Sequence, residues 1–372
     1  MNVNRVVEVL ESIAPLRYAE SWDNVGLLIG SRRWAAERVM LTIDLTEEVL
    51  HEAMDADVQM IISYHTPILQ PLKALTDEAE SQRIALEAAR SAIAVFSPHT
   101  ALDAAPGGVN DWLAAALGAG DVRALTGHRS LPESEQFKIV TFCPAEGVDR
   151  LRNALASIGA GRIGEYELCS FEIEGTGTFL GGPGTKPAVG ESGTLERVSE
   201  TRLEMVCPGA ALGLAVLTLR EFHPYEEPPV EIYELRSRPQ RHIGAGRRVV
   251  LDQKTTLKQL VERTKQQLGL GQLRIAPGRE APRWYQTLGL CAGAGGSLFE
   301  TAIDQGCELF LTGEMRHHDV LAAQARGCTV MLAGHTNTER GYLKQLRKTL
   351  VSRLPGLTLT IAKRDIDPLK VM

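Results

Sequence analysis

The sequence lacks any apolar run of the roughly 18 to 20 residues that a membrane-spanning helix requires. Its first twenty residues, MNVNRVVEVLESIAPLRYAE, have the spacing of an amphipathic helix and include acidic residues, unlike the basic start and apolar centre of a secretion signal. An excess of basic residues is also missing, because the formal net charge is −6 at pH 7. We therefore expect a soluble, cytoplasmic protein with no membrane partner and no overall electrostatic reason to bind nucleic acid.

Cysteine is sparse and shows no metal-site spacing. The six cysteines are scattered without a C-x-x-C pair, so we expect reduced structural thiols and no thiolate metal site. The glycine-rich stretch GTGTFLGGPGTKPAVGESG, residues 175–193, lacks the lysine-serine ending of a nucleotide-binding P-loop. This stretch is therefore expected to be a mobile loop.

The length of 372 residues, with 44% hydrophobic content, is enough for more than one domain. Between Phe137 and Leu235 the apolar periodicity alternates in the order β-α-β-β-α-β, which is typical of a ferredoxin-like arrangement. The flanking segments TGHRSLPESEQ and RSRPQRHIGAG are polar and rich in turn-forming residues, as linkers are. We predict one core lobe at 1–132, an inserted domain at 137–235 and a second core lobe at 240–372.

Two stretches repeat the same pattern on either side of the predicted insertion. AVFSPHTALD ends an apolar strand with His99 and places Asp103 four residues later, and CTVMLAGHTNTE does the same with His335 and Glu339. In the second stretch, His335 is expected to end a strand and Glu339 to open a helix. The carboxyl ends of strands form the ligand-binding crevice of open α/β sheets, so these side chains are expected to lie there.

The segments that precede these stretches also match. LHEAMDADVQMIISYH, residues 50–65, resembles FETAIDQGCELFLTGE, residues 299–314, and the match places His65 where the later copy has Glu314. The fold class we predict is therefore α/β, with a two-lobed core built from a duplicated strand-helix-strand unit and interrupted by the ferredoxin-like domain.

Histidines and acids at equivalent strand ends form a mixed nitrogen and oxygen ligand set, which suits zinc, manganese, iron, cobalt or nickel. The candidates are His65, His99, His335, Asp103, Glu339 and Glu314. A lone histidine at a strand end is usually a structural residue, but three at equivalent positions, two with an acid at i+4, favour ligands. Because the set exceeds what one tetrahedral ion needs, it predicts a dinuclear hydrolytic site with a bridging carboxylate.

Other polar residues lie near these motifs. Asp23 and Asn24, in SWDNVGL, either orient a water or substrate group in the cleft or satisfy their own loop backbone. Lys73, Arg316 and Arg340 offer charges for an anion such as phosphate, although surface basic residues are usually only solvated.

Five blocks of this sequence resemble the signature blocks of the NGG-interacting-factor-three-like family, whose members are also named GTP cyclohydrolase 1 type 2. The blocks are AESWDNVGLLIG (19–30), SYHTPILQPLK (63–73), HTALDAAPGGVNDWLA (99–114), LTGEMRHHDVL (311–321) and AGHTNTERGYL (333–343). The resemblance implies a two-lobed α/β core with a dinuclear metal site in the cleft, and a homohexamer built as a trimer of dimers. The middle segment, including HPYEEPPVEIYEL (223–235), resembles the PII-like or CutA-like insertion of longer members.

Carried onto this chain, the family's ligands fall on His65 and Asp103 for one metal ion, on His335 for the other and on Glu339 as the bridge. Many members have two adjacent histidines where this chain has Tyr64 and His65. A neutral phenol is a poorer ligand than imidazole, so the second ion is absent, binds more weakly or takes a ligand from elsewhere.

Two classes of function follow. One is a metal-dependent, cyclohydrolase-like hydrolase acting on a small nucleotide-like or phosphate-bearing substrate, in which His99 or Glu314 moves protons. The other is a metal-handling or regulatory protein without turnover. The ligand residues are the same in both classes, so the sequence leaves the choice open.

Overall fold

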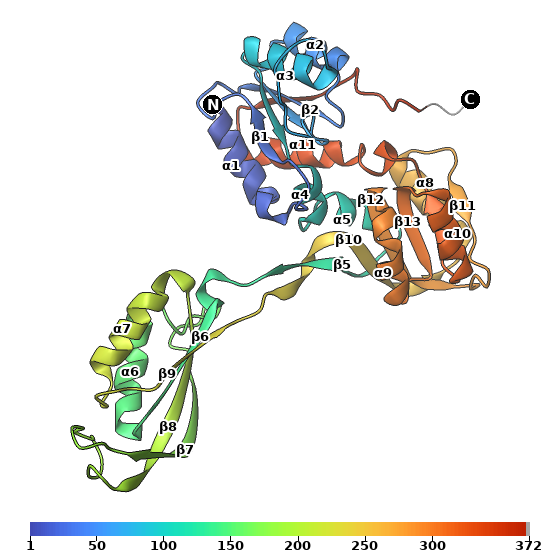
Figure 1. Cartoon of the computed structure of the whole chain (residues 1–372). Coiled ribbons are helices and arrows are strands. Elements are labelled where there is room, and N and C mark those ends of the chain that lie inside the picture. The colour runs from blue at the N-terminus through green and yellow to red at the C-terminus, as the bar shows by residue number, and fades with distance from the viewer. Residues whose placement is uncertain (370–372) are drawn as a thin grey trace. The chain divides into compact units, whose positions relative to one another are not determined.

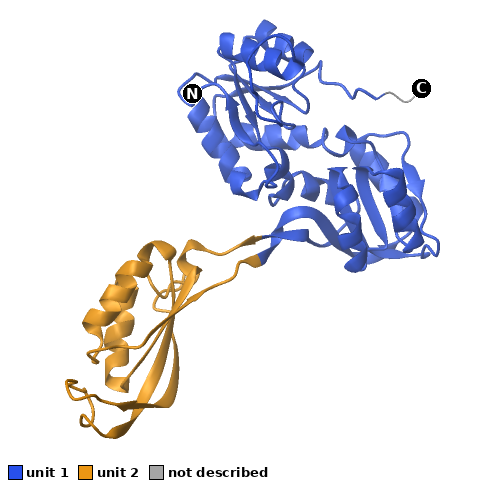
Figure 2. Ribbon diagram, viewed as in Figure 1, with its two compact units in different colours: residues 1–128, 239–372 blue, residues 129–238 orange. Residues whose placement is uncertain are grey.

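The computed structural model describes residues 1–369 and divides the chain into two compact units (Figure 2). Unit 1 contains residues 1–128 and the chain from residue 239 onward, and unit 2 contains residues 129–238. The predicted insertion, 137–235, lies inside unit 2. No helix among residues 1–369 combines the length and the apolar character needed to cross a membrane.

The first sheet of unit 1 has the strand order β1-β4-β3-β2-β15. Its strands are β1 (Gly26–Ile29), β2 (Arg38–Thr42), β3 (Met60–Ser63), β4 (Ala94–Ser97) and β15 (Thr358–Ile361). All neighbours run parallel except β1, which pairs antiparallel with β4. The central strands are continuous apolar runs because helices cover both of their faces.

Alternate residues of these strands enter two different cores. Leu41, Ile62 and Phe96 face one core, which also contains buried side chains of α1 and α11. Met40 and Ile61 face the other, with buried side chains of α2 and α3. These two helices lie next to each other at the top of the view in Figure 1. The helices of this half are α1 (Val3–Ile13), α2 (Glu47–Asp55), α3 (Glu80–Arg90), α4 (His99–Ala104), α5 (Val109–Ala114) and α11 (Tyr342–Arg353).

The second sheet of unit 1 has the order β11-β14-β13-β12-β10-β5. Its strands are β5 (Gly120–Ser130), β10 (Arg238–Thr255), β11 (Arg274–Ala276), β12 (Tyr285–Ala294), β13 (Leu309–Glu314) and β14 (Thr329–Leu332). The helices that follow its strands are α8 (Leu257–Leu268), α9 (Phe299–Asp304) and α10 (His317–Ala325). One hydrophobic core contains side chains from both sheets, including Leu290 and Leu311 of this one, so the two halves of unit 1 are packed together.

Both sheets contain the same repeat of elements. In each, three parallel strands alternate with two helices, as β2-α2-β3-α3-β4 and as β12-α9-β13-α10-β14, and an antiparallel strand pairs with the last of them. This order is what the repeated sequence segments predict. It also puts His65 and Glu314 at corresponding strand ends, after β3 and at the end of β13.

The predicted limits of the two lobes need correction. β5, from the segment 1–132, joins the second sheet, and β15, from the segment 240–372, pairs in parallel with β2 of the first sheet. The halves of unit 1 therefore exchange strands instead of being contiguous in sequence. Such long-range pairings depend on packing in the folded chain, and a short apolar strand carries no local signal of the sheet it will join.

Unit 2 consists of a four-stranded antiparallel sheet and two helices. Its elements are β6 (Phe137–Cys143), α6 (Ala145–Ser157), β7 (Phe171–Leu180), β8 (Leu195–Cys207), α7 (Leu212–Phe222) and β9 (Val230–Glu234). The sheet order is β7-β8-β6-β9, and side chains of both helices pack against it in a core that unit 2 forms by itself. The element order is the β-α-β-β-α-β pattern seen in the sequence.

We predict that the candidate metal site survives removal of unit 2. β5 and β10 are neighbours, with Gly120 beside Val250 and Gly127 beside Gln240, so these strands run in opposite directions and a tight turn can join them. A chain in which an Asn-Gly turn replaces residues 131–237 should fold and keep its metal content, measured by circular dichroism and elemental mass spectrometry. A folded chain that has lost its metal would show that unit 2 supplies ligands.

The stability of unit 2 should fall in mild acid because of His223, the only histidine between residues 129 and 238. Its Nδ1 accepts a hydrogen bond from the Tyr225 backbone N–H (3.0 Å), and Nε2–H donates to the Phe142 carbonyl (3.1 Å). Burial lowers the pKa of His223 below 6.5, so the unfolded chain binds the proton first and stability is lost as pH falls below that value.

The measurement is urea unfolding of residues 129–238 alone at pH 7.5 and pH 5.5. The midpoint should be lower at pH 5.5, and His223→Gln should remove most of the difference because an amide donates and accepts without titrating. An equal pH dependence in both chains would assign the effect to other groups.

Candidate metal centre

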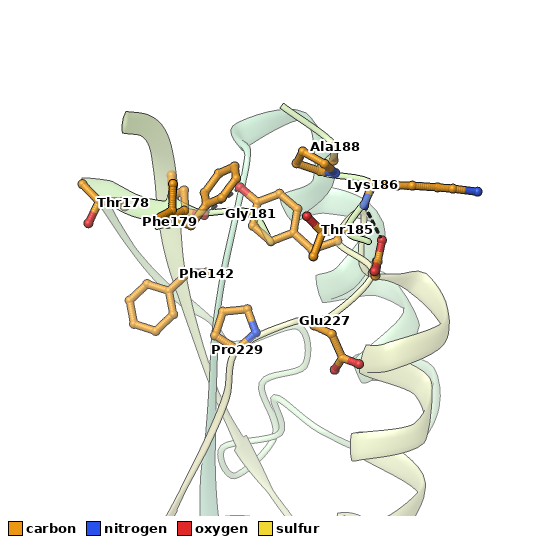
Figure 3. A pocket seen from close by; sticks show the side chains of 15 residues that line it. Phe142, Thr178, Phe179, Gly181, Thr185, Lys186, Ala188, Glu227 and Pro229 are labelled. Carbon is orange, nitrogen blue, oxygen red and sulfur yellow. Dashed lines mark hydrogen bonds between the residues drawn. The ribbon is translucent and has the colours of Figure 1, made fainter. Parts of the chain in front are cut away.

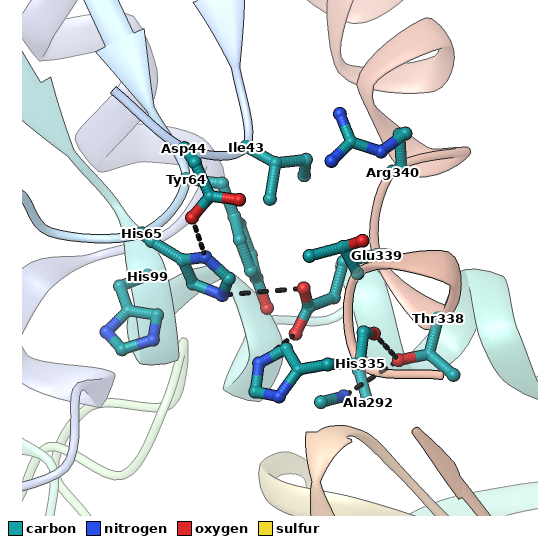
Figure 4. Close-up of polar contacts among 12 residues, drawn as sticks. Ile43, Asp44, Tyr64, His65, His99, Ala292, His335, Thr338, Glu339 and Arg340 are labelled. Atoms are coloured by element: carbon teal, nitrogen blue, oxygen red, sulfur yellow. Dashed lines mark hydrogen bonds and ion pairs between the residues drawn. The ribbon is translucent and has the colours of Figure 1, made fainter. Parts of the chain in front are cut away.

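Three histidines lie at the carboxyl ends of parallel strands in unit 1. His65 follows β3, His99 follows β4 and His335 follows β14. All three line one cavity of about 790 Å³. The ring centroid of His65 is 5.4 Å from that of His99 and 5.3 Å from that of His335 (Figure 4). The two sheets therefore bring their strand-end histidines to the same place, as expected for ligand sites in α/β folds.

Each imidazole is held by a carboxylate at Nδ1. The pairs are His65 with Asp44 (2.8 Å), His99 with Asp23 (2.8 Å) and His335 with Glu314 (2.9 Å). A carboxylate accepts a hydrogen bond from Nδ1–H, which fixes the tautomer and leaves Nε2 as the free ring nitrogen. This arrangement is typical of histidines that bind metal ions through Nε2.

Glu339 lies between His65 and His335. Its Oε2 is 3.4 Å from Nε2 of His65, and its Oε1 is 3.5 Å from Nε2 of His335 (Figure 4). The side chain is only 3% exposed, and Oε2 has no hydrogen-bond partner among the described residues. A buried carboxylate oxygen without a partner is costly, so this position favours a bound cation.

Gly293 leaves the space that such an ion would need. Its φ is +63°, and a Cβ at this position would lie 2.6 Å from Oε1 of Glu339 and 3.1 Å from Nε2 of His335. Any side chain would therefore fill the space beside the two ligand atoms. The backbone N–H of Gly293 donates to Oγ1 of Thr338 (2.8 Å), which ties β12 to the turn that carries Glu339.

The residues present therefore fit a metal ion. His65, His335 and Glu339 each offer one ligand atom, and these atoms lie within 4.8 Å of one another. Two imidazoles and one carboxylate are a common ligand set for catalytic zinc and for non-haem iron, and they leave coordination positions open. This group could hold a metal ion.

Asp103 lines the same cavity but is engaged by a neighbour. The hydroxyl of Tyr64, itself 2% exposed, donates to Oδ1 of Asp103 at 2.5 Å. Tyr64 thus occupies one carboxylate oxygen of a predicted ligand instead of facing the cavity as a ligand. The assignment of Asp103 to an ion stays a prediction.

Burial and charge shift two pKa values at the site. Burial alone would lower the pKa of His65, but its contacts with Asp44 and Glu339 outweigh burial and raise the pKa to about 10. Burial and the Glu339 charge raise the pKa of Asp103 to about 6, against the opposing hydrogen bond from Tyr64. A protonated imidazole cannot bind a cation, so an ion entering here must displace the His65 proton.

The structure places two predicted residues differently from the sequence interpretation. Glu314 is half exposed and contacts Nδ1 of His335 from outside the cavity, which suits an orienting role, while direct proton transfer by Glu314 stays a prediction. Glu339 does not open a helix, because a 3-10 turn over Thr336–Thr338 precedes it and α11 begins at Tyr342. In this turn the Thr338 hydroxyl donates a hydrogen bond to the His335 carbonyl before α11 begins.

The sequence interpretation did not find Asp44 or Gly293. Asp44 lies two residues beyond the end of β2, at the same edge of the sheet as His65, so its position after an apolar strand was an available signal. Gly293 has no comparable signal, because its importance comes from its distance to Glu339 in the folded chain.

Comparison with known proteins identifies the family of this chain. The family model described as Duf34/NIF3 (NGG1p interacting factor 3) matches residues 1–368. The chain belongs to this family. The rat protein named NIF3-like protein 1 is 35% identical over 378 residues, which cover 100% of this chain and 93% of the rat protein. The resemblance inferred from the sequence blocks is thereby confirmed.

Two bacterial proteins of similar length show the same relationship. A Bacillus subtilis protein named GTP cyclohydrolase 1 type 2 homolog is 31% identical, with 99% of this chain and 98% of that protein covered. The crystal structure of a Bacillus cereus protein related to NIF3 matches with a TM-score of 0.66 at 30% identity, covering 100% of this chain and 99% of that one. The Duf34/NIF3 relationship therefore extends over both units.

Position 64 should control how many ions this chain retains. Tyr64→His adds an imidazole and frees Asp103, so retained metal should rise from about one to about two ions per chain. Tyr64→Phe is the matched control, because it frees Asp103 without adding a ligand and should stay near the wild-type value. Metal per chain is measured by mass spectrometry during graded dialysis against a chelator. Two equally firm ions in the wild type, unchanged in Tyr64→His, would contradict this role.

Proposed function

We propose that this chain is a divalent-metal-dependent hydrolase, cyclohydrolase-like in reaction type, that acts on a small molecule in the cavity beside Glu339. The observation that carries the proposal is the buried carboxylate of Glu339, which lies between Nε2 of His65 and Nε2 of His335 and whose Oε2 has no hydrogen-bond partner among the described residues. The names of relatives such as the Bacillus subtilis homolog point to the same class of reaction. A divalent ion held by these residues would supply Lewis acidity toward the bond to be cleaved.

The chain's own residues provide the other parts of a hydrolysis. Asp23 holds Nδ1 of His99, and its side chain is fully buried. Burial alone would raise the pKa of Asp23, but hydrogen bonds from His99 and Thr100 outweigh it and keep the pKa below its ordinary value. Asp23 accepts the hydrogen bond from Nδ1–H of His99 and leaves Nε2 to receive a proton from the attacking water and to return it to the leaving group.

Two ions are part of the proposal. The two oxygens of Glu339 face different imidazoles, His65 on one side and His335 on the other, which is the arrangement of a bridging carboxylate. The hydrogen bond from Tyr64 to Asp103 weakens the ligand set on the His65 side, so we propose that the two positions differ in affinity.

A second candidate is a metal-handling or regulatory protein without turnover. It is favoured by a separate cavity of about 450 Å³ in unit 2 (Figure 3). Phe142, Phe179 and Pro229 give this cavity apolar walls, and Tyr225 bonds Glu200 at its edge (2.6 Å). A domain with a pocket of its own suits a sensing role, and the PII-like or CutA-like character proposed for unit 2 agrees with its β-α-β-β-α-β order.

Comparison of the Glu339→Gln and Glu314→Gln variants should distinguish a metal ligand from a residue that only orients a ligand. Glu339→Gln removes the charge between the two histidines, so the variant should lose its metal and any hydrolysis while remaining folded. Glu314→Gln only weakens the orientation of His335 and should lower metal affinity about ten- to one-hundred-fold. The readouts are metal content, circular dichroism and turnover of nucleotides, pterins and phosphodiesters.

The same assays distinguish the two candidates. Metal-dependent turnover of any compound, lost in Glu339→Gln, supports the hydrolase. Full metal occupancy with rapid metal exchange and no turnover across the panel supports metal handling instead. A folded Glu339→Gln variant with undiminished metal would overturn the assignment of the site itself.

A further inference from the structure

Trp22 is an exposed aromatic residue at the rim of the metal-site cavity. It lines the cavity and is 60% exposed, and its ring contacts His99 edge to face, with ring centroids 5.9 Å apart. Leu69, 45% exposed, lines the same cavity, as does the partly buried Leu298. An exposed apolar residue standing alone needs no explanation, but an aromatic and two leucines around one cavity form an apolar wall for a ligand.

The turn that carries Trp22 is firmly anchored. Glu20 and Asp23 close the turn, since the Asp23 N–H donates to the Glu20 carbonyl (3.0 Å), and the Glu20 N–H donates to Oγ1 of Thr100 (3.0 Å). The Thr100 N–H (3.1 Å) and hydroxyl (2.5 Å) both donate to the Asp23 carboxylate. Trp22 is thus held in place at the rim although little packs against it, which makes it a preformed stacking surface.

Histidine is the only basic residue type that lines the cavity within residues 1–369. The charged side chains that line it, the histidines apart, are the carboxylates of Glu20, Asp103 and Glu339, and within residues 1–369 neither lysine nor arginine lines it. When no ion is bound, these three carboxylates repel the negative charges of a polyphosphate chain.

The basic residues that the sequence offered for an anion lie elsewhere. Arg340 pairs with the buried Asp365 (2.7 Å), and Arg316 lines a neighbouring cavity that Glu314 and Asp319 also line. Lys73 is exposed and does not line the metal-site cavity.

The backbone N–H groups beside the ligand residues already donate hydrogen bonds to side chains. The N–H groups of Ala292, Gly293 and Gly295 donate to Asn110, Thr338 and Thr312, respectively. An anion-binding nest of backbone N–H groups is therefore not open on this wall.

We infer that the substrate is a planar, uncharged heteroaromatic compound of nucleoside or pterin size, stacked on Trp22, and not a nucleoside triphosphate. The inference rests on the proposed hydrolase, because it names the substrate class of that site. Trp22 contacts His99, and the ring centroid of His99 is 5.4 Å from that of His65, so a ring stacked on Trp22 lies in the same cavity as the ligand group. Trp22 determines specificity by binding the ring.

Calorimetric titration with guanosine, pterin and GTP tests this inference in metal-free and metal-loaded protein. In metal-free protein, guanosine or pterin should bind, and GTP should bind at least about ten-fold more weakly because of the three carboxylates. Trp22→Ala should weaken guanosine or pterin binding by about ten-fold or more, as loss of base stacking does, while Trp22→Phe should stay within about three-fold. Trp284→Ala is the matched control, since Trp284 is 47% exposed and does not line this cavity, and it should change nothing.

The outcomes separate this inference from the proposed function. GTP binding as tightly as guanosine, no binding of guanosine and pterin at millimolar concentration, or equal affinities in Trp22→Ala and wild type would each overturn the inference. Metal content, measured on the same samples, is independent of Trp22. Ring binding that depends on Trp22 in a protein that takes up no metal would uphold the stacking surface and overturn the hydrolase.

Discussion

The candidate site depends on one interaction made three times, the hydrogen bond from Nδ1 of a histidine to a carboxylate. The ring of an imidazole at a strand end is mobile unless its second nitrogen is held by a hydrogen bond. A mobile ring loses conformational entropy when it binds an ion, which weakens binding. The carboxylates come from loops and strand ends remote in sequence, as with Asp23 and His99. Asp44, which holds His65, keeps its pKa below the ordinary value although burial opposes this, because the charges of His65 and Arg340 stabilise its ionised form.

The fold supplies this arrangement by bringing two similar sheets together around one core. A repeat of parallel strands and helices puts polar residues at the carboxyl edge of each sheet, and the shared core holds the two edges against each other. The buried Arg247 of β10 reinforces the contact, since it pairs with Asp111 and donates to the carbonyls of Ala104 and Ala105, directly after Asp103. Arg247 is fully buried, and its many partners offset the cost of removing a charge from water.

Local patterns predicted the parts of the structure that depend on neighbouring residues. The spacings from His335 to Glu339 and from His99 to Asp103 each lie within a short segment, so the sequence was enough to identify these four residues of the cavity. The alternation of strands and helices in unit 2 is local in the same way. The exchange of β5 and β15 could not be predicted, because strand pairing across the chain is decided by packing. The same limit applies to Gly293 and to the contact between Tyr64 and Asp103, which exist only where separate segments meet.

A metal ion held at this site would also stabilise unit 1. His65 follows a strand of the first sheet, whereas His335 and Glu339 follow a strand of the second, so an ion bound by all three clips the two sheets together. Without an ion, Glu339 keeps a buried oxygen that no hydrogen bond satisfies, and the folded chain bears that cost. Binding therefore stabilises the folded state by removing this cost as well as by the ligand bonds themselves. The buried carboxylate that favours a cation would thus also destabilise unit 1 when no cation is bound.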